Sequence, residues 1–164
     1  MSDWFVVNVR DVPWSRHDKF GAGGRFERED GEFEQVGINI RVLEPGQPNC
    51  LYHRENLQED FLVLSGECLL LVDGEERPLE AWDFVHMPPD VDHVFVGAGD
   101  GPCVILMTGA RSADEELFYP VAEVAQKHGA SAERGTPSPE EAYAPFGERR
   151  AGERPASWDS LPWA

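Results

Sequence analysis

Two stretches of the chain, residues 52–67 and 82–97, combine imidazole and carboxylate side chains with the alternation that is typical of β-strands. An ionised carboxylate is costly to bury in an apolar interior unless it is paired or binds a metal. Imidazole and carboxylate ligands together suit a divalent transition metal, and two histidines with one carboxylate suit non-haem Fe(II). The hypothesis from residue types alone is therefore one metal site that is built by both stretches.

The first stretch places its chemistry on one face of a strand. Residues two apart in a strand share a face, so His53 and Glu55 point the same way. After a polar interruption at residues 56–58, Glu59 and Phe61 continue on one parity. Carboxylates on the same face as apolar side chains are unusual in an ordinary strand, which favours a functional role.

The second stretch supplies another imidazole. His93 shares its face with Phe95 in a strand that follows a turn. If this face lines the same interior, His53, Glu59 and His93 form a set of two histidines and one carboxylate, with Glu55 nearby. Glu55 is then either a fourth metal ligand or a general base beside the metal, and the sequence leaves both roles open.

The first of these patterns resembles a motif of the cupin superfamily, which runs G-x5-H-x-H-x3/4-E-x6-G. His53 matches its first histidine, Glu59 its glutamate and Gly66 its closing glycine. Glu55 stands where the motif has a second histidine, and Gly46 precedes His53 with one residue more than the pattern expects. The departure at Glu55 implies two histidines with two glutamates, or a site with three ligands.

The second pattern resembles the other cupin motif, G-x5-P-x-G-x2-H-x3-N. Pro88 and His93 match in register, whereas Trp82 and Asp90 stand at the two glycine positions and Gly97 replaces the asparagine. The resemblance covers roughly residues 36 to 110 of the chain.

The resemblance implies an all-β fold, namely a cupin-type antiparallel β-barrel (double-stranded β-helix or jelly roll) with short C-terminal helices and an extended tail. It implies a divalent metal ion such as Fe, Mn, Zn or Ni and a small-molecule substrate or ligand. The reactions of the family include dioxygenation, isomerisation and epimerisation, so the resemblance chooses no reaction. A non-catalytic ligand-binding cupin and a degenerate cupin without metal are the alternatives.

Composition restricts the partners of this 164-residue chain, whose length predicts a single domain. Its formal net charge of −17 argues against nucleic acid and anionic membranes as partners, since both require basic patches.

The start of the chain resembles no signal peptide, and its longest apolar run, near residues 69–72, is too short to cross a bilayer. Cys50, Cys68 and Cys103 have no CxxC spacing and are expected to be free thiols, which predicts a cytoplasmic protein.

Turn-forming residues and changes in sequence pattern divide the chain into three predicted parts. Residues 1–35 contain a short strand at residues 4–7 and a flexible, glycine-rich loop at residues 21–24. Residues 36–110 form the barrel core with both motifs, and residues 111–164 form a helical extension and tail.

The extension is expected to hold two short helices, over residues 120–127 and from a capping box at Ser138 through Tyr143. The tail ends in Trp158, Leu161 and Trp163, whose apolar area favours docking on the barrel or on a second subunit. Disorder of the tail up to about residue 155 is the alternative. A homodimer is also predicted.

Two other polar side chains have alternative placements. Arg41 reaches a substrate carboxylate if its strand face lines the pocket, but a solvated outer face is the favoured expectation. His17 is expected at the surface, and His86 either lines the pocket or packs as a satisfied histidine.

Overall fold

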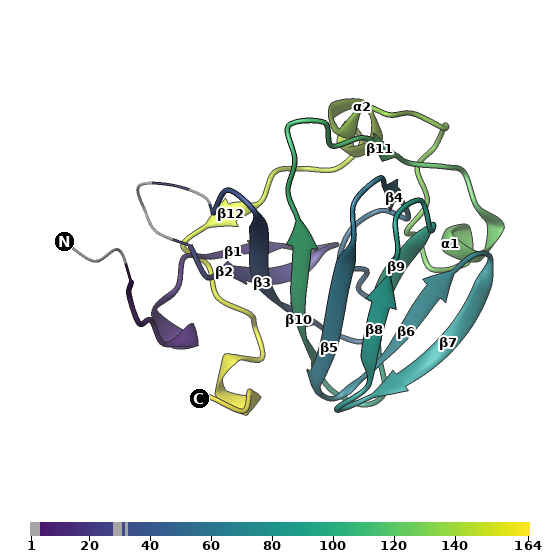
Figure 1. Ribbon diagram of the computed structural model, residues 1–164. Helices are drawn as coiled ribbons and strands as arrows, with labels where there is room; N and C mark the ends of the chain where they lie inside the picture. The colour runs from purple at the N-terminus through teal and green to yellow at the C-terminus, as the bar shows by residue number, and fades with distance from the viewer. Residues whose placement is uncertain (1–3, 28–30, 32) are drawn as a thin grey trace.

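The computed structural model describes residues 4–27, 31 and 33–164, and the fold is all-β with two short helices, as predicted (Figure 1). One antiparallel sheet has the order β12-β1-β2-β3-β10-β5-β8. Its strands are β1 (Trp14–His17), β2 (Gly21–Arg25), β3 (Val36–Leu43), β5 (Glu59–Ser65), β8 (Phe84–Met87), β10 (Cys103–Ala110) and β12 (Arg150–Ala151).

A second sheet closes the other side of the barrel in the order β7-β6-β9. Its strands are β6 (Glu67–Val72), β7 (Glu75–Glu80) and β9 (His93–Ala98), and a separate two-stranded ribbon joins β4 (Arg54–Glu55) to β11 (Leu117–Phe118). Buried side chains from both larger sheets meet in one core, which includes Phe61 and Val63 of β5, Leu70 of β6, Phe95 of β9 and Ile105 of β10.

The turns follow the predicted chemistry. The hairpin between β6 and β7 turns at Asp73 and Gly74, with φ angles of 47° and 81°. Trp82 and Asp90 stand where the second motif expects glycine, and both adopt positive φ, at 80° and 67°. The backbone therefore keeps the left-handed conformation of these turns although the side chains depart from the pattern.

The glycine-rich segment is a strand, so the predicted flexible loop at residues 21–24 is wrong. Strand β2 pairs with both β1 and β3, and Gly23 lies opposite Arg41. A Cβ on Gly23 would lie 2.4 Å from Nη1 of Arg41, so the missing side chain makes room for this guanidinium. Residues 4–7 form no strand, and the chain enters the sheet only at β1.

The C-terminal tail docks on the sheet of its own chain. Trp158 and Trp163 pack against Trp14 with ring centroids 5.5 and 6.0 Å apart, and Leu161 is buried in the same cluster. Ile40 belongs to this cluster, so the tail covers the apolar face of β3 that points away from the barrel interior. These contacts need no second subunit, and the homodimer stays a prediction.

Two helices precede the tail, α1 (Glu123–Lys127) and α2 (Pro139–Tyr143). Both lie within the predicted segments, and the Ser138 side chain caps α2 by accepting a hydrogen bond from the backbone N–H of Glu141. The Ser138 N–H instead donates to the Thr136 hydroxyl, so only half of the predicted capping box forms. Single 3₁₀ turns lie at Val9–Asp11 and Trp158–Ser160.

The closing glycine of the first motif yields a stability prediction. Gly66 has φ of 75°, and a Cβ there would lie 2.4 Å from the carbonyl oxygen of Pro102. We expect Gly66→Ala to lower the free energy of unfolding by roughly 2 kcal/mol or more, since left-handed strain and a backbone clash add.

Gly101→Ala is the matched control, because a Cβ at Gly101 would meet no atom within 4 Å. Chemical denaturation of the wild type and both variants measures the difference. Equal stability of the two variants would contradict the steric account of Gly66.

Candidate metal centre

Two histidines that are 40 positions apart are joined through their own backbones. The N–H of His93 donates to the carbonyl of His53 at 2.8 Å, and the N–H of His53 donates back to the carbonyl of His93 at 3.1 Å. His93 begins β9, while His53 immediately precedes β4. This reciprocal pair brings the imidazole centroids to 5.0 Å from each other.

Each imidazole is oriented by a hydrogen bond on Nδ1, the nitrogen that points away from the cluster. Nδ1 of His53 lies 2.9 Å from the carbonyl oxygen of Leu51, and Nδ1 of His93 lies 3.0 Å from that of Val91. A carbonyl only accepts, so each Nδ1 carries the proton, and in a neutral ring Nε2 presents its lone pair. Metal-binding histidines have this arrangement, in which the outer contact sets both tautomer and ring orientation.

Glu59 completes a cluster of three donors at the start of β5. Its Oε2 lies 3.1 Å from Nε2 of His93, and one ligand atom each from His53, Glu59 and His93 lies within 4.8 Å of the others. Both histidines are buried. Two nitrogens and one carboxylate oxygen at this separation are a donor set that fits a divalent transition metal.

Glu55 faces the same cavity from β4 and lies next to the three-donor cluster. Its Oε1 lies 3.3 Å from Nε2 of His53, and its side chain is only 16% exposed. The carboxylate is therefore beside the cluster, and its role as a metal ligand or as a base stays a prediction.

Cys50 and the neighbouring carboxylates favour the protonated form of His53. Burial alone would lower the pKa of His53, but Cys50, Glu55 and Glu59 together outweigh burial and hold that pKa well above its ordinary value. Burial, followed by the charges of Glu55 and Glu59, raises the pKa of Glu115. A bound cation would relieve the repulsion between these acids.

The surrounding pocket measures about 300 Å³, and several of its walls come from outside the two motifs. The Tyr119 ring stacks on His53 at 5.7 Å and next to Tyr143 at 5.7 Å. Both tyrosines belong to the C-terminal extension at residues 111–164, which is predicted to lie outside the barrel core. Their only signal was the aromatic character of residues 118–119 and 143 in an otherwise polar segment.

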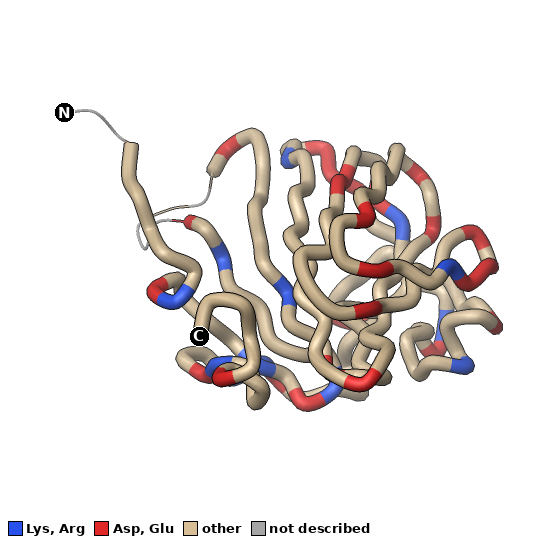
Figure 2. Tube along the Cα trace, turned by 90° about the horizontal axis from the view of Figure 1, so that it is seen from below, with Lys and Arg blue, Asp and Glu red and all other residues tan. Residues whose placement is uncertain are grey.

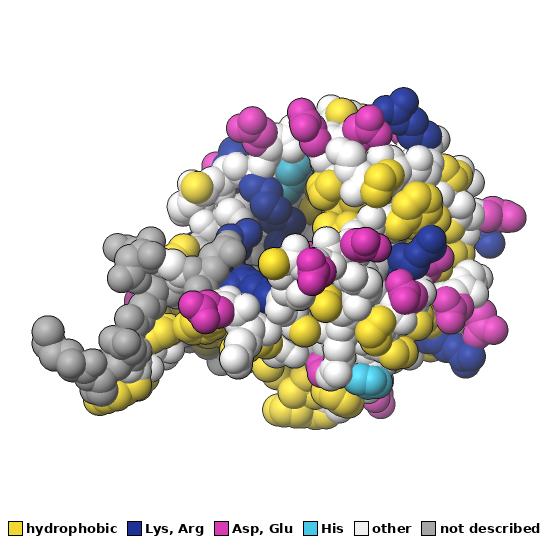
Figure 3. Space-filling model, turned by 45° about the horizontal axis from the view of Figure 1, so that its top comes forward, with side chains coloured by type: hydrophobic (Ala, Val, Ile, Leu, Met, Phe, Trp, Pro, Cys, Tyr) yellow, Lys and Arg dark blue, Asp and Glu magenta, His cyan; other side chains and the backbone are white. Residues whose placement is uncertain are grey.

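Basic side chains also enter this pocket. Arg41 lines it, so its face of β3 is the pocket face, and the favoured expectation of a solvated outer face is wrong. Acidic residues predominate along the trace (Figure 2), yet Figure 3 shows Lys and Arg side chains gathered along a hollow in which a histidine is visible.

The remaining histidines lie away from the centre. His86 is exposed on β8 and pairs with Asp60 at 2.7 Å, so it neither lines the pocket nor packs inside. His17 is buried rather than at the surface, and its Nδ1 accepts from the backbone N–H groups of Lys19 and Phe20.

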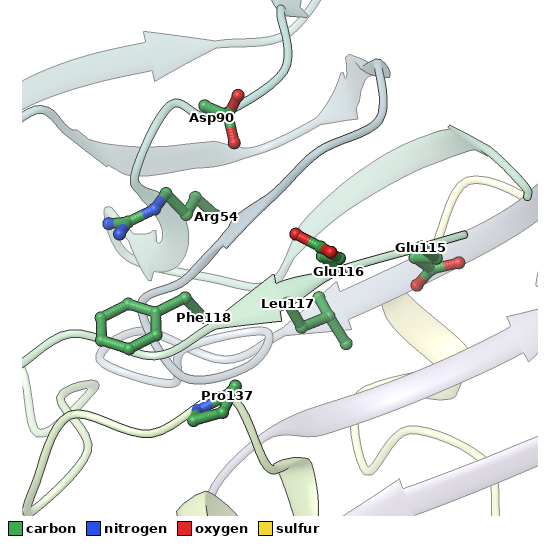
Figure 4. A pocket seen from close by; sticks show the side chains of 7 residues that line it. All are labelled: Arg54, Asp90, Glu115, Glu116, Leu117, Phe118 and Pro137. Carbon is green, nitrogen blue, oxygen red and sulfur yellow. The ribbon is translucent and has the colours of Figure 1, made fainter.

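A larger hollow of about 610 Å³ lies beside the β4–β11 ribbon (Figure 4). Its one lining arginine, Arg54, is paired with Asp92 at 3.0 Å and lies over the Phe118 ring. No histidine is among the described residues that line this hollow, so its chemistry differs from that of the metal pocket.

Comparison with known proteins agrees with this geometry. A family model for the cupin domain matches residues 39–109. No curated protein matches the chain in sequence.

Several solved structures are similar in fold. The sugar phosphate isomerase of a cupin superfamily from Silicibacter pomeroyi shares 24% identity, with a TM-score of 0.62 over 70% of this chain and 81% of that one. A putative sugar phosphate isomerase from Acidithiobacillus ferrooxidans shares 25% identity, with a TM-score of 0.53 over 59% and 64% of the two chains. The polyketide cyclase RemF from Streptomyces resistomycificus shares 15%, with a TM-score of 0.57 over 65% and 79%.

Within the described residues, the structure contains no helix that is both long and apolar enough to span a membrane.

The raised pKa of His53 predicts a pH dependence of the metal-free protein. A raised pKa in the folded state contributes stability that is complete below the unfolded value of about 6.5 and is lost as pH rises through the folded pKa. We expect the free energy of unfolding to fall over that window, as measured by denaturant titrations at a series of pH values.

Glu55→Gln removes one partner of the protonated imidazole and should reduce this fall. Asp60→Asn is the matched control, because its imidazole partner, His86, is exposed outside the pocket. A fall that is the same in the wild type and in Glu55→Gln would contradict the assigned contact.

Proposed function

We propose that this chain, in which residues 39–109 match a family model for the cupin domain, is a divalent-metal-dependent enzyme that acts on a small molecule inside the barrel. The observation that supports this proposal most directly is the cluster of donor atoms from His53, Glu59 and His93 within 4.8 Å, at the wall of a pocket. Three protein ligands leave coordination positions for substrate and water, which is the arrangement of catalytic rather than structural sites.

The donor set fits a metal in its chemistry as well as its spacing. Both Nδ1 atoms are engaged by backbone carbonyls, so both Nε2 atoms are available as ligands. A bound divalent ion would supply Lewis acidity toward a substrate oxygen. The chain would hold the ion through His53, Glu59 and His93 and enclose the substrate with Tyr119.

Glu55 supports an isomerase-type reaction, in which a proton is removed from one carbon and returned to its neighbour. We assign Glu55 as the group that carries this proton, because its carboxylate faces the pocket beside the cluster without being part of it. Contact with the His53 ring at 3.3 Å limits where the carboxylate can point. The putative isomerase from Acidithiobacillus ferrooxidans is named for a reaction of this class.

Dioxygenation is the second candidate, and the donor set itself favours it. Two histidines and one carboxylate with open positions are the ligands of non-haem Fe(II) oxygenases. In that case Glu55 would orient the substrate. Oxygen consumption in the presence of Fe(II) with a panel of catechols and diketones separates this candidate from isomerisation.

Metal binding tests the proposal without knowledge of the substrate. We expect untagged protein to contain a divalent metal by elemental analysis. The metal-free protein should gain about 5–10 °C in melting temperature with Mn, Fe(II), Ni or Zn at about 100 times the dissociation constant. His53→Ala should abolish this gain because one of three ligands is lost.

His86→Ala is the matched control, since this exposed histidine lies on β8 outside the pocket. It should retain the full thermal gain. Purified protein without metal, together with no gain from any of the four ions, would favour a degenerate cupin and contradict the proposal.

The Glu55→Gln variant distinguishes the two possible roles of Glu55, a general base and a metal ligand. We expect this variant to keep the metal-dependent thermal gain but to lose about 10²–10⁴-fold in turnover. Deuterium incorporation from D₂O into a panel of α-hydroxy carbonyl compounds, followed by NMR, measures that turnover. Loss of metal binding in Glu55→Gln would instead make Glu55 a ligand.

A further inference from the structure

Two guanidinium groups lie together beside the metal pocket without a carboxylate partner. Within the described part of the chain, Arg41 has no ion pair, and its Nε is buried without a hydrogen-bond partner. Arg149 is partly buried and donates only to the backbone carbonyls of Gly21 and Phe20, both at 3.3 Å. The two guanidinium groups repel each other: burial and then the charge of Arg41 lower the pKa of Arg149 to about 10.

This isolation is unusual in a chain with 31 acidic and 14 basic residues. Other arginines find carboxylates, such as Arg54 with Asp92 at 3.0 Å and Arg150 with Asp18 at 2.8 Å. Carboxylates are therefore abundant, but none stands beside Arg41 or Arg149 in the described structure. Like charges that are desolvated without a counter-ion are costly, and an external anion would relieve that cost.

The space between the two groups is a cavity of about 170 Å³ with no acidic residue among the described residues that line it. A water molecule occupies about 30 Å³ of liquid, so the cavity has room for about five atoms of that size. Its lining consists of His17, Phe20, Arg41, Asn49, Cys50, Tyr143, Gly147 and Arg149.

Tyr143 adds a neutral donor. Its hydroxyl oxygen accepts from the backbone N–H of Leu51 at 3.0 Å, which leaves the hydroxyl proton to point toward a ligand. Burial raises the pKa of Tyr143, so the hydroxyl stays protonated and remains a donor.

This cavity adjoins the metal pocket. Arg41, Asn49, Cys50 and Tyr143 line both spaces. Cys50 Sγ lies 3.6 Å from Nδ1 of His53, so the cationic cavity begins directly behind a proposed metal ligand. A small molecule can therefore span both.

We propose that Arg41 and Arg149, with the hydroxyl of Tyr143, form a subsite for the anionic group of the substrate, a phosphate or a carboxylate, whose other end reaches the metal centre. The assignment of that anion to a substrate rests on the proposed function, whereas anion binding itself does not. The planar donors of guanidinium match the oxygens of either group. The subsite also offsets the repulsion that a chain with net charge −17 exerts on an anionic substrate.

Inorganic phosphate and acetate are the probes, titrated by calorimetry and thermal shift into metal-free full-length protein at matched ionic strength. We expect one or both to bind the wild type and to raise its melting temperature. Arg41→Gln should weaken that binding at least about tenfold. Arg41→Lys should give an intermediate affinity, because lysine keeps the charge but lacks the paired planar N–H donors of guanidinium. Arg77→Gln, an exposed arginine paired with Glu75, should bind like the wild type.

Gly23→Ala tests the same subsite without removing a charge. Its methyl group would lie 2.4 Å from Nη1 of Arg41 and displace the guanidinium, so binding should weaken. Gly31→Ala, whose methyl group would meet no atom of the described residues within 4 Å, should have no effect. Tighter binding of phosphate than acetate indicates a phosphate ester substrate, and the reverse indicates a carboxylate.

The metal-free format keeps this test separate from the proposed function. His53→Ala should lose metal binding but keep anion binding. The metal site and the anion subsite can therefore fail independently, and the two failures can be told apart. The subsite is wrong if neither probe binds the wild type, or if Arg41→Gln and Arg149→Gln both bind them as tightly as the wild type does.

Discussion

The reciprocal backbone hydrogen bonds between His53 and His93 are the contact on which the rest of the site depends. They tie the segment before β4 to the first residue of β9, and thereby set the two imidazoles side by side at a fixed spacing. Backbone contacts do not vary with side-chain rotamer, so the spacing is preorganised before any ligand binds. Each ring then needs only one carbonyl contact on Nδ1 to direct Nε2 inward.

The pocket that results has two electrostatic halves. Glu55, Glu59 and Glu115 gather at the metal end, where burial and then the charges of Glu55 and Glu59 disfavour the ionised form of Glu115. Arg41 and Arg149 gather at the other end, where no carboxylate from the described residues lines the cavity. A molecule with an anionic group and a metal-binding oxygen would satisfy both halves at once, and the enclosing tyrosines would exclude water from it.

The metal-site residues and the barrel were largely predictable from short-range sequence patterns. Strand alternation placed His53, Glu55 and Glu59 on one face, and the motif spacing added His93. The barrel and the hairpin at Asp73 also follow from short-range signals. These features are encoded by neighbours in sequence, where periodicity and turn chemistry are informative.

The errors share a different cause. Residues 21–24 look like a flexible loop by composition, but the glycines serve close packing against Arg41, which only tertiary contacts reveal. The inward face of Arg41 could not be read from β3 alone, because the tail supplies an apolar partner for the opposite face. Tyr119 and Tyr143 reach the pocket from an extension whose path over the barrel leaves no local signature.

Anomalous diffraction from crystals of the metal-loaded protein, collected at the absorption edge of the bound ion, tests the central claim most directly. The account predicts a single strong peak within bonding distance of Nε2 of His53, Nε2 of His93 and a carboxylate oxygen of Glu59. A peak elsewhere on the chain, or coordination through Nδ1 of either ring, would contradict it.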